Sequence, residues 1–372
     1  MEILDVQQRI EGGETNVRTS NIELYRIVCM LVIVAHHYVV NSGLKGLMED
    51  NASNVSSLYL WIFGMWGKTG INCFLMITGY YMCKSQITIR KFLKLILQIY
   101  LYNIVIYLIF LSLGLESVSP RRLMQLALPI WGVSTDFVSG FILFWLTIPF
   151  WNVLIHNISK RQHLILLLLL LTFYSILSNI PTFEVNLNYF SWFGVLYIIA
   201  SYIRIYPHAL LSNARLWGMS SIVSILMAIV SVYLLYRFKG EYHYWFVSES
   251  NKFLAVAVAV STFLWIKKIN IPYNKWINTI GASTFGVLLI HANSAVMRQW
   301  LWQDIVDCVG HYSLPLWHLI GFSTGVVITI FFTCIIIDYI RIKIIEEPFF
   351  RWFDKKPRFA KLTRFLTERY EQ

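Results

Sequence analysis

The chain has 372 residues, of which 57% are hydrophobic and 14% are charged, whereas about 25% of the residues of an ordinary soluble domain are charged. Apolar runs of roughly 20 residues recur along it. This length lets a helix cross a bilayer, and the runs exclude a single soluble core. Much of the net charge of +11 lies in every second loop between these runs. That distribution argues against a nucleic-acid-binding surface.

The apolar runs predict an all-α, polytopic membrane protein with about ten transmembrane helices. Residues 1–20 are polar and lack the apolar centre of a cleavable signal peptide, so the first helix is expected to direct insertion. The eighth predicted helix is short enough to be tilted, packed inside or partly re-entrant, and residues 123–133 are expected at the membrane interface. The predicted helices cover residues 22–41, 58–82, 92–114, 137–156, 163–180, 189–206, 216–236, 252–267, 279–299 and 316–340.

Lysine and arginine predict the orientation of these helices. They concentrate in the segments that would lie inside if the N-terminus were cytoplasmic, which predicts that both termini are cytoplasmic. The chain then divides into a cytoplasmic segment, 1–20, a membrane domain, 21–345, and a basic cytoplasmic tail, 346–372. The tail is expected to lie on the anionic inner leaflet. No internal repeat is apparent, which weakens an interpretation as a secondary transporter.

Polar residues at both ends of the first predicted helix carry the main functional signal, because polar groups inside a bilayer are costly and usually mark function. Glu23 and Arg26 lie near its start, and His36 and His37 lie toward its other end. Arg26 and His37 are separated by about 1100° of helical rotation and therefore share one face, about 16 Å apart along the axis. Such a face suits a long anionic ligand that enters from one side and reacts at its tip.

Three of these residues, Glu23, His36 and His37, form the predicted catalytic group, and Arg26 is predicted to bind the anionic ligand. A neutral imidazole suits a general base because its unperturbed pKa is about 6.5, so His37 is the favoured base. His36 points about 80° away from Arg26 and is the alternative base, or the neighbour that orients His37. Glu23 would orient Arg26. The competing interpretation is a histidine that only forms hydrogen bonds between helices.

The second predicted helix combines small residues with polar ones. Glycines recur between Gly64 and Tyr80, which is typical of close helix packing. Lys68 and Asn72 are four residues apart and so share a face, and their cost in lipid predicts that they line a polar cavity. Lys68, Asn72 or a tyrosine, with Tyr80 as the candidate, would stabilise an oxyanion.

Two more groups of polar residues are candidates for binding or catalysis. Arg90, Lys91 and Lys94 begin the third predicted helix, either as a positive-inside anchor or as a phosphate site beside Arg26. His291 is a second imidazole at membrane depth, for which packing and function both remain open. Neither the five cysteines nor any His/Asp cluster has the spacing of metal ligands, so no metal is expected.

Charged residues close the last predicted helix. Glu346 and Glu347 precede Pro348, which stops continuation of a helix, and this pattern favours a helix end and anchor over catalysis. Asp338 lies near the cytoplasmic end of the same helix, where it is expected to pair with a basic residue.

Five motifs in this order resemble the acyltransferase-3 family of bacterial integral-membrane acyltransferases, which O-acetylate envelope glycans. The resemblance covers about residues 20–350 and rests on Glu23 to Arg26 followed by His36-His37, on residues 70–81, on Arg90 to Lys94, on Phe285 to His291 and on Glu346 to Phe349. It implies acetyl-coenzyme A as the donor, about ten spans and the bacterial cytoplasmic (inner) membrane.

The resemblance also implies roles for particular residues. Arg26 and His37 match the basic residue and the histidine of the family's first helix, and Lys91 and Lys94 match the basic pair of its third helix. The pair is lysine here rather than arginine, which loses bidentate phosphate geometry. No extracytoplasmic hydrolase-like domain follows, so the chain is expected to acylate its acceptor itself or to pass the group to a partner.

The predicted function is therefore transfer of an acetyl group from cytoplasmic acetyl-coenzyme A to a hydroxyl of an extracytoplasmic or lipid-linked envelope glycan, such as an exopolysaccharide. Coenzyme A phosphates would bind near Arg26, Arg90, Lys91 and Lys94. The expected partners are the bilayer, an envelope polysaccharide or lipid-linked sugar, and a second copy or glycan-assembly proteins. Succinyl or another acyl group remains open. The alternative is a transporter or flippase of an envelope lipid or glycan intermediate, in which the buried Arg, Lys and His residues form a substrate path.

Overall fold

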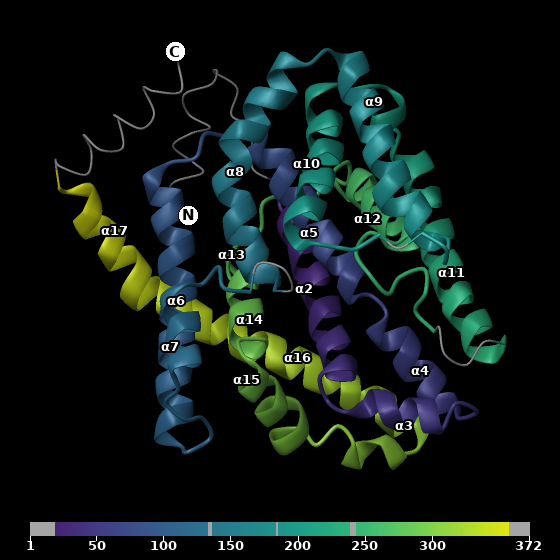
Figure 1. The fold of residues 1–372 in the computed structure, drawn as a ribbon, viewed down its shortest axis with the longest axis vertical. Coiled ribbons are helices and arrows are strands. Elements are labelled where there is room, and N and C mark those ends of the chain that lie inside the picture. The colour runs from purple at the N-terminus through teal and green to yellow at the C-terminus, as the bar shows by residue number, and fades with distance from the viewer. Residues whose placement is uncertain (1–18, 133–135, 184, 239–242, 357–372) are drawn as a thin grey trace.

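The computed structural model describes residues 19–132, 136–183, 185–238 and 243–356, and within these ranges the chain is helical and contains no strand. Figure 1 shows the helices running between an upper end, where α2 (Asn21–Val40) begins, and a lower end, where α2 passes into α3 (Leu44–Asp50). Seven helices of the described ranges are long and apolar enough to cross a membrane, and one bent pair would make an eighth. The prediction of an all-α polytopic membrane protein is confirmed.

Two helices form the centre of the bundle. The first, α2, packs against α4, α5, α13, α14 and α16, and the second, α5, also packs against α10 and α12. Close approach needs small residues: a Cβ atom on Gly70 would lie 3.0 Å from the Cys29 carbonyl oxygen, and one on Gly79 would lie 2.9 Å from Ala200 Cβ. The glycines predicted to pack helices therefore do so. These central elements are α4 (Val55–Gly64), α5 (Gly67–Met82), α10 (Tyr189–Ile205), α12 (Phe253–Ile266), α13 (Lys275–Ala282), α14 (Thr284–His291) and α16 (Leu316–Arg341).

The outer helices expose apolar side chains. Leu108 on α6, Leu168 on α9, Met219 on α11 and Ile336 on α16 are each at least half exposed. A soluble protein rarely exposes so much contiguous apolar surface, whereas a bilayer covers it. The remaining elements are α6 (Ile89–Ser112), α7 (Pro120–Ala127), α8 (Phe137–Asn157), α9 (Lys160–Leu171), α11 (Ala214–Phe238), α15 (Ala295–Gln299), α17 (Glu347–Asp354), π-helical segments Thr172–Ile176, Trp300–Ile305 and Ile342–Glu346, and 3₁₀ segments Leu177–Asn179, Leu210–Ser212 and Gly310–Ser313.

Every predicted span coincides with helical structure, but the helices differ in length and continuity. The second is two helices, α4 and α5, separated at Met65 and Trp66. The ninth was predicted as one helix and is broken, because residues 275–291 and 295–313 meet at 97°. The sixth and eighth, α10 and α12, have 17 and 14 residues. The exact number of spans remains a prediction.

Polar caps fix where several helices begin. The side chain of Thr88 accepts the backbone N–H of Lys91 at the start of α6, and Asp136 accepts that of Ser139 at the start of α8. Ser159 forms a capping box with Gln162 at the start of α9. Each cap satisfies a backbone donor that the first helical turn leaves unpaired.

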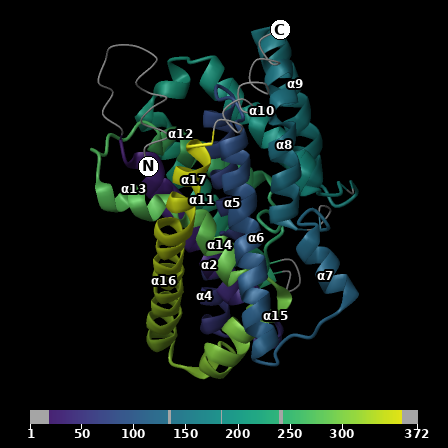
Figure 2. The same ribbon diagram turned by 90° about the vertical axis from the view of Figure 1, so that its left-hand side faces the viewer.

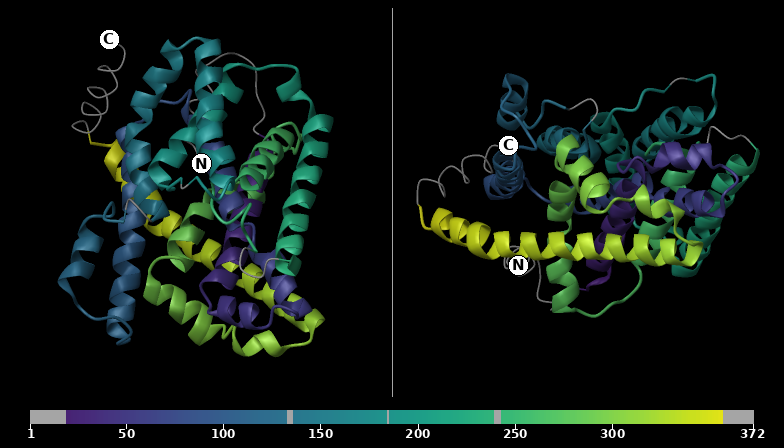
Figure 3. Two further views of the ribbon diagram at one scale, coloured as in Figure 1. Left: turned by 45° about the vertical axis from the view of Figure 1, so that its right-hand side comes forward. Right: turned by 90° about the horizontal axis from the view of Figure 1, so that it is seen from below.

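The last helix leads away from the lower end. α16 crosses one face of the bundle diagonally and continues through a π-helical turn into α17 (Figure 3). Figure 2 shows the hairpin of α6 and α7 beside this bundle. The helix runs through Glu346, where the basic tail was predicted to begin. Most of that tail, and the predicted cytoplasmic segment up to residue 18, lie outside the described residues.

Candidate active site

A cavity of about 490 Å³ lies between α2, α5, α8 and α14, and His37 forms part of its wall. Its lining combines charged, amide and aromatic side chains with aliphatic ones. The charged and amide members are Asn103, Arg122, Gln125, Asp136, Asn293 and Arg298, and the aromatic members are Phe74, Trp131, Phe137 and Tyr189. A concave site with a few convergent polar groups is the form that a small-molecule site takes.

His37 is paired with the second histidine at membrane depth. His37 Nδ1 lies 2.9 Å from His291 Nε2, and His291 Nδ1 lies 2.6 Å from the Val287 carbonyl oxygen. A carbonyl oxygen can only accept, so a neutral His291 carries its proton on Nδ1 and accepts at Nε2. His37 must then donate from Nδ1. This leaves the Nε2 lone pair of His37 unprotonated, which is the form that a general base requires.

The adjacent histidine has different surroundings. His36 Nδ1 lies 2.6 Å from the Gly64 carbonyl oxygen, and its ring packs on α5 at Gly67, where an added Cβ would lie 2.2 Å from His36 Cγ. His36 is not among the residues that line the cavity. The structure thus brings His37 and His291 together at a cavity and directs His36 into a helix contact.

The start of α2 carries the predicted acid–cation pair. Arg26 Nη1 lies 3.3 Å from both carboxylate oxygens of Glu23, which is 6% exposed. Gly281 permits this burial, since a Cβ there would lie 2.5 Å from Glu23 Oε2. Glu23 therefore pairs with Arg26, and the role of Arg26 in donor binding stays a prediction. Arg26 lies toward the upper end and is not among the residues that line the cavity of His37.

Lys68 and Asn72 do not line this cavity, although both are tied to its surroundings. The Lys68 ammonium donates to the Tyr189 hydroxyl at 3.1 Å and lies 3.4 Å from a Glu249 carboxylate oxygen. Asn72 is fully buried, donates to the Ser250 carbonyl at 2.6 Å and accepts the Trp192 indole N–H at 2.9 Å. The role of either residue in stabilising an oxyanion stays a prediction.

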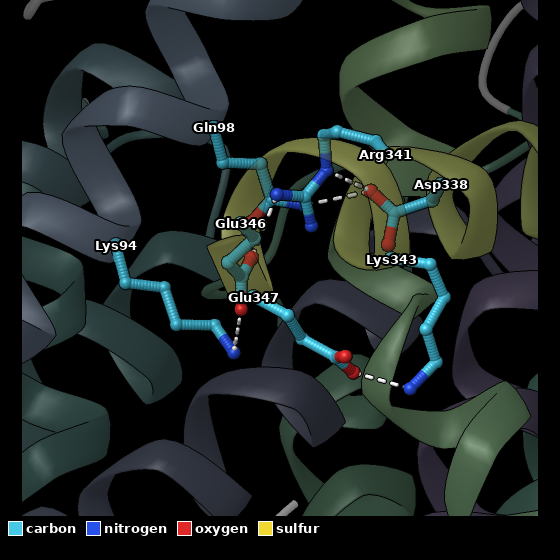
Figure 4. Close-up of polar contacts among 7 residues, drawn as sticks. All are labelled: Lys94, Gln98, Asp338, Arg341, Lys343, Glu346 and Glu347. Atoms are coloured by element: carbon cyan, nitrogen blue, oxygen red, sulfur yellow. Dashed lines mark hydrogen bonds and ion pairs between the residues drawn. The ribbon is translucent and has the colours of Figure 1, made fainter. Parts of the chain in front are cut away.

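The predicted cations of the third helix all have protein partners. Lys94 forms a 2.7 Å ion pair with Glu346, and Arg90 forms a 2.6 Å ion pair with Asp354 (Lys94 is shown in Figure 4). Lys91 donates to the Ser85 hydroxyl and to the Gln86 carbonyl. Their role in phosphate binding stays a prediction, but carboxylates already neutralise two of them.

Behind these pairs lies a buried network that joins α6 to α16. Asp338 is fully buried, and its Oδ1 accepts from Tyr102 at 2.7 Å, Gln98 at 3.1 Å and Arg341 Nε at 2.8 Å. Arg341 also bonds Glu346 at 2.7 Å (Figure 4). The expected partner of Asp338 is confirmed, and Glu346 belongs to this structural network.

Several residues of the cavity wall carry no signal in the sequence. Arg298 and Asn293 follow His291 after the break in the ninth span, and Tyr189 begins α10. The nearest sequence feature is the polar pair 293–294, which interrupts an apolar run at the 97° bend. This interruption could have indicated that the span is broken beside the cavity. Tyr80 lies elsewhere, in a second cavity at the upper end.

The fold and this site define a polytopic helical membrane protein with a histidine pair at an internal cavity. The profile of one family, described as an acyltransferase domain, matches residues 19–339. The chain belongs to this acyltransferase-3 family and is a membrane acyltransferase. The matched region includes His37, His291 and the third-helix cations. No curated protein and no solved structure matches the chain.

Proposed function

We propose that this acyltransferase moves an acetyl group from acetyl-coenzyme A to a hydroxyl of an envelope glycan or lipid-linked sugar. The observation that carries the proposal is the His37–His291 pair at the wall of a polar and aromatic cavity. The enzyme would lie in the bacterial inner membrane with its upper end toward the cytoplasm. The predicted concentration of Lys and Arg at that end supports this orientation.

The hydrogen-bond chain defines how His37 would act. Its free Nε2 takes the proton of an acceptor hydroxyl, and the resulting oxygen nucleophile attacks the thioester carbonyl carbon. The tetrahedral intermediate collapses with cleavage of the C–S bond. The coenzyme A thiolate then takes the proton back from His37 Nε2, so the products are an acetyl ester and a free thiol. His291 Nε2 accepts from His37 Nδ1 throughout and stabilises the imidazolium that forms between these steps.

The cavity offers a cation for the developing oxyanion. Arg298 lines it together with His37, and Arg298 forms no ion pair with the carboxylates of the described residues. A cation placed where negative charge develops stabilises the transition state more than the ground state. We propose Arg298 as this group, alongside Lys68 and Asn72, which lie outside the cavity.

The lining also suits a carbohydrate acceptor. The amides of Asn103, Gln125 and Asn293 can donate to and accept from sugar hydroxyls, while Trp131 and Tyr189 present aromatic rings. Aromatic side chains provide a large apolar face with a polar handle. This combination supports a hydroxyl-rich acceptor over a simple lipid chain. Family membership favours acyl transfer over the alternative of a flippase.

The test is mass analysis of cell-surface glycans from strains that carry the wild-type gene, no gene, or the His37→Ala variant. Acetyl esters should be present only with the wild-type gene. A parallel assay with the purified protein and labelled acetyl-coenzyme A follows label into glycan extracts. Equal acetylation of the glycans in the His37→Ala and wild-type strains would remove His37 from the mechanism. Glycans that are transported but never acetylated would favour the flippase.

A further inference from the structure

A second cavity, of about 340 Å³, lies at the upper end where α5, α10 and α12 finish. Four cationic side chains line it from three different segments. Lys84 follows α5, Arg204 lies in the last turn of α10, and Lys267 and Lys268 follow α12. Its other lining residues are Tyr80, Ile203, Pro207, Leu211 and Ser212, and none of them is acidic.

These four cations have no carboxylate partners within the described part of the chain. Arg204 donates from Nη1 to the Tyr80 hydroxyl at 3.0 Å, but its buried Nε donor has no hydrogen-bond partner. Both Arg204 and Lys267 lie over the Tyr80 ring, at 4.7 Å and 5.7 Å from its centroid. Arg90 and Lys94, the predicted phosphate ligands, are by contrast paired with carboxylates.

The cluster is electrostatically strained. Burial, together with the neighbouring charges of Lys268 and Arg204, lowers the pKa of Lys267 to about 8. Like charges disfavour one another's ionised forms. An anion bound in the cavity would be attracted by these cations and would reduce their mutual repulsion.

The basic cavity and the cavity of His37 share α5 as a wall. Tyr80 lines the basic cavity and Phe74 lines the cavity of His37. The two residues are six positions apart, which corresponds to about 9 Å along the helix axis and about 600° of rotation, so they lie on different faces of α5. A flexible arm of the length of pantetheine can span such a separation.

We infer that the cavity of Tyr80, Lys84, Arg204, Lys267 and Lys268 binds a phosphate-bearing anion and that this anion is the nucleotide end of the acyl-coenzyme A donor. The inference rests on the proposed function for the identity of the donor. It places the donor phosphates among uncompensated cations rather than at the ion-paired start of α6. The same phosphate chemistry is present in an anionic phospholipid headgroup, which is the competing source.

The test measures the affinity of coenzyme A by calorimetry for the purified chain in nanodiscs of neutral phosphatidylcholine. Lys267→Gln/Lys268→Gln should raise the dissociation constant at least about tenfold, because charge-assisted hydrogen bonds are lost. The matched control is Lys160→Gln/Arg161→Gln, which removes two charges at exposed positions outside the cavity at the start of α9. It should leave the affinity unchanged. Equal thermal unfolding midpoints show that both variants fold.

The outcomes separate this inference from the function on which it rests. If coenzyme A binds the wild type tightly and Lys267→Gln/Lys268→Gln does not change its affinity, the proposed site is wrong. Coenzyme A as the donor is then still supported. Loss of affinity in Arg90→Gln/Lys94→Gln alone moves the phosphates to α6 and also overturns the proposed site. A wild-type chain that does not bind coenzyme A refutes the proposed donor as well.

In discs with phosphatidylglycerol, mass spectrometry of retained lipid completes the test. If the Lys267→Gln/Lys268→Gln variant loses this lipid while coenzyme A affinity is unchanged, the cavity holds a headgroup.

Discussion

Two buried polar regions of this bundle differ in whether they border a cavity. Around Asp338, the Oδ1 atom accepts from Tyr102, Gln98 and Arg341, whereas Oδ2 is buried without a partner in the described chain. Arg341 bridges Asp338 to Glu346 (Figure 4). Around His37, the imidazole chain ends on a side chain that lines a cavity and whose Nε2 has no hydrogen bond to the described chain. The first region stabilises the contact of α6 with α16, and the second retains unused capacity for a ligand.

The difference shows how polar residues in a membrane protein can be sorted. Each is costly in lipid, so cost alone does not separate structural from reactive groups. The separating property is whether a polar side chain lines a cavity that a ligand can enter. Lys94 and Glu346 pair with each other, whereas His37 and Arg204 each line a cavity and keep one nitrogen without a partner in the described chain.

The largest expected effect comes from removing the reactive nitrogen. His37→Ala should lower kcat for acetyl transfer by about 10²–10⁴-fold, the usual contribution of a general base, while coenzyme A affinity stays near that of the wild type. The matched variant is His36→Ala, which disturbs a helix contact next to the same position. His36→Ala is expected to retain most of the activity. A reversal of these two results would make His36 the base.

The next effect is on stability and concerns the network around Asp338. Asp338→Ala leaves Arg341 buried with only Glu346 as its partner, and loss of one member of a buried pair costs about 3 kcal/mol. The thermal unfolding midpoint in detergent should therefore fall by several degrees. Lys343→Ala provides the control, because its pair with Glu347 is exposed on both sides and such pairs contribute about 0–1 kcal/mol. Equal midpoints for the two variants would contradict the structural role of Asp338.

The periodicity of the sequence is sufficient to predict the features that one helix determines by itself. The positions of the spans and the shared face of Arg26 and His37 follow from a rise and a rotation per residue. It could not reveal contacts between distant segments. His37 meets His291 across 254 residues, and Lys84, Arg204 and Lys267 converge from three helix ends. Tertiary packing also determined that Lys94 is paired with Glu346 and that the ninth span is bent.

His291 should show an effect of positioning rather than of proton transfer. His291→Ala removes the acceptor that fixes the tautomer of His37, and a misplaced catalytic group can cost about 10²-fold in kcat. The KM for the donor should stay unchanged. His291→Gln keeps an oxygen able to accept from His37 Nδ1, so it should recover part of the lost rate. If the Gln variant is as slow as the Ala variant, the hydrogen bond is not what His291 contributes.

The smallest expected effect tests the basic cavity through pH. Lys267 faces Lys84, Arg204, Lys268 and the Tyr80 ring there, and its pKa is lowered to about 8 in the unliganded protein. A bound phosphate would raise this pKa, so binding takes up a proton above pH 8 and affinity falls as pH rises. The dissociation constant of coenzyme A should increase by about tenfold between pH 7 and pH 9, because one proton is linked to binding over this range.

Lys267→Gln separates this linkage from other titrations. The variant binds coenzyme A more weakly at pH 7, but its affinity should vary little up to pH 9, since it lacks the amine whose protonation is linked to binding. The test therefore compares how strongly the dissociation constant changes with pH in the two proteins. The affinity at a single pH is not sufficient, because a general loss of positive charge would also lower it. Parallel slopes for the wild type and the variant would mean that the phosphates do not contact Lys267, and would return them to the cations at the start of α6.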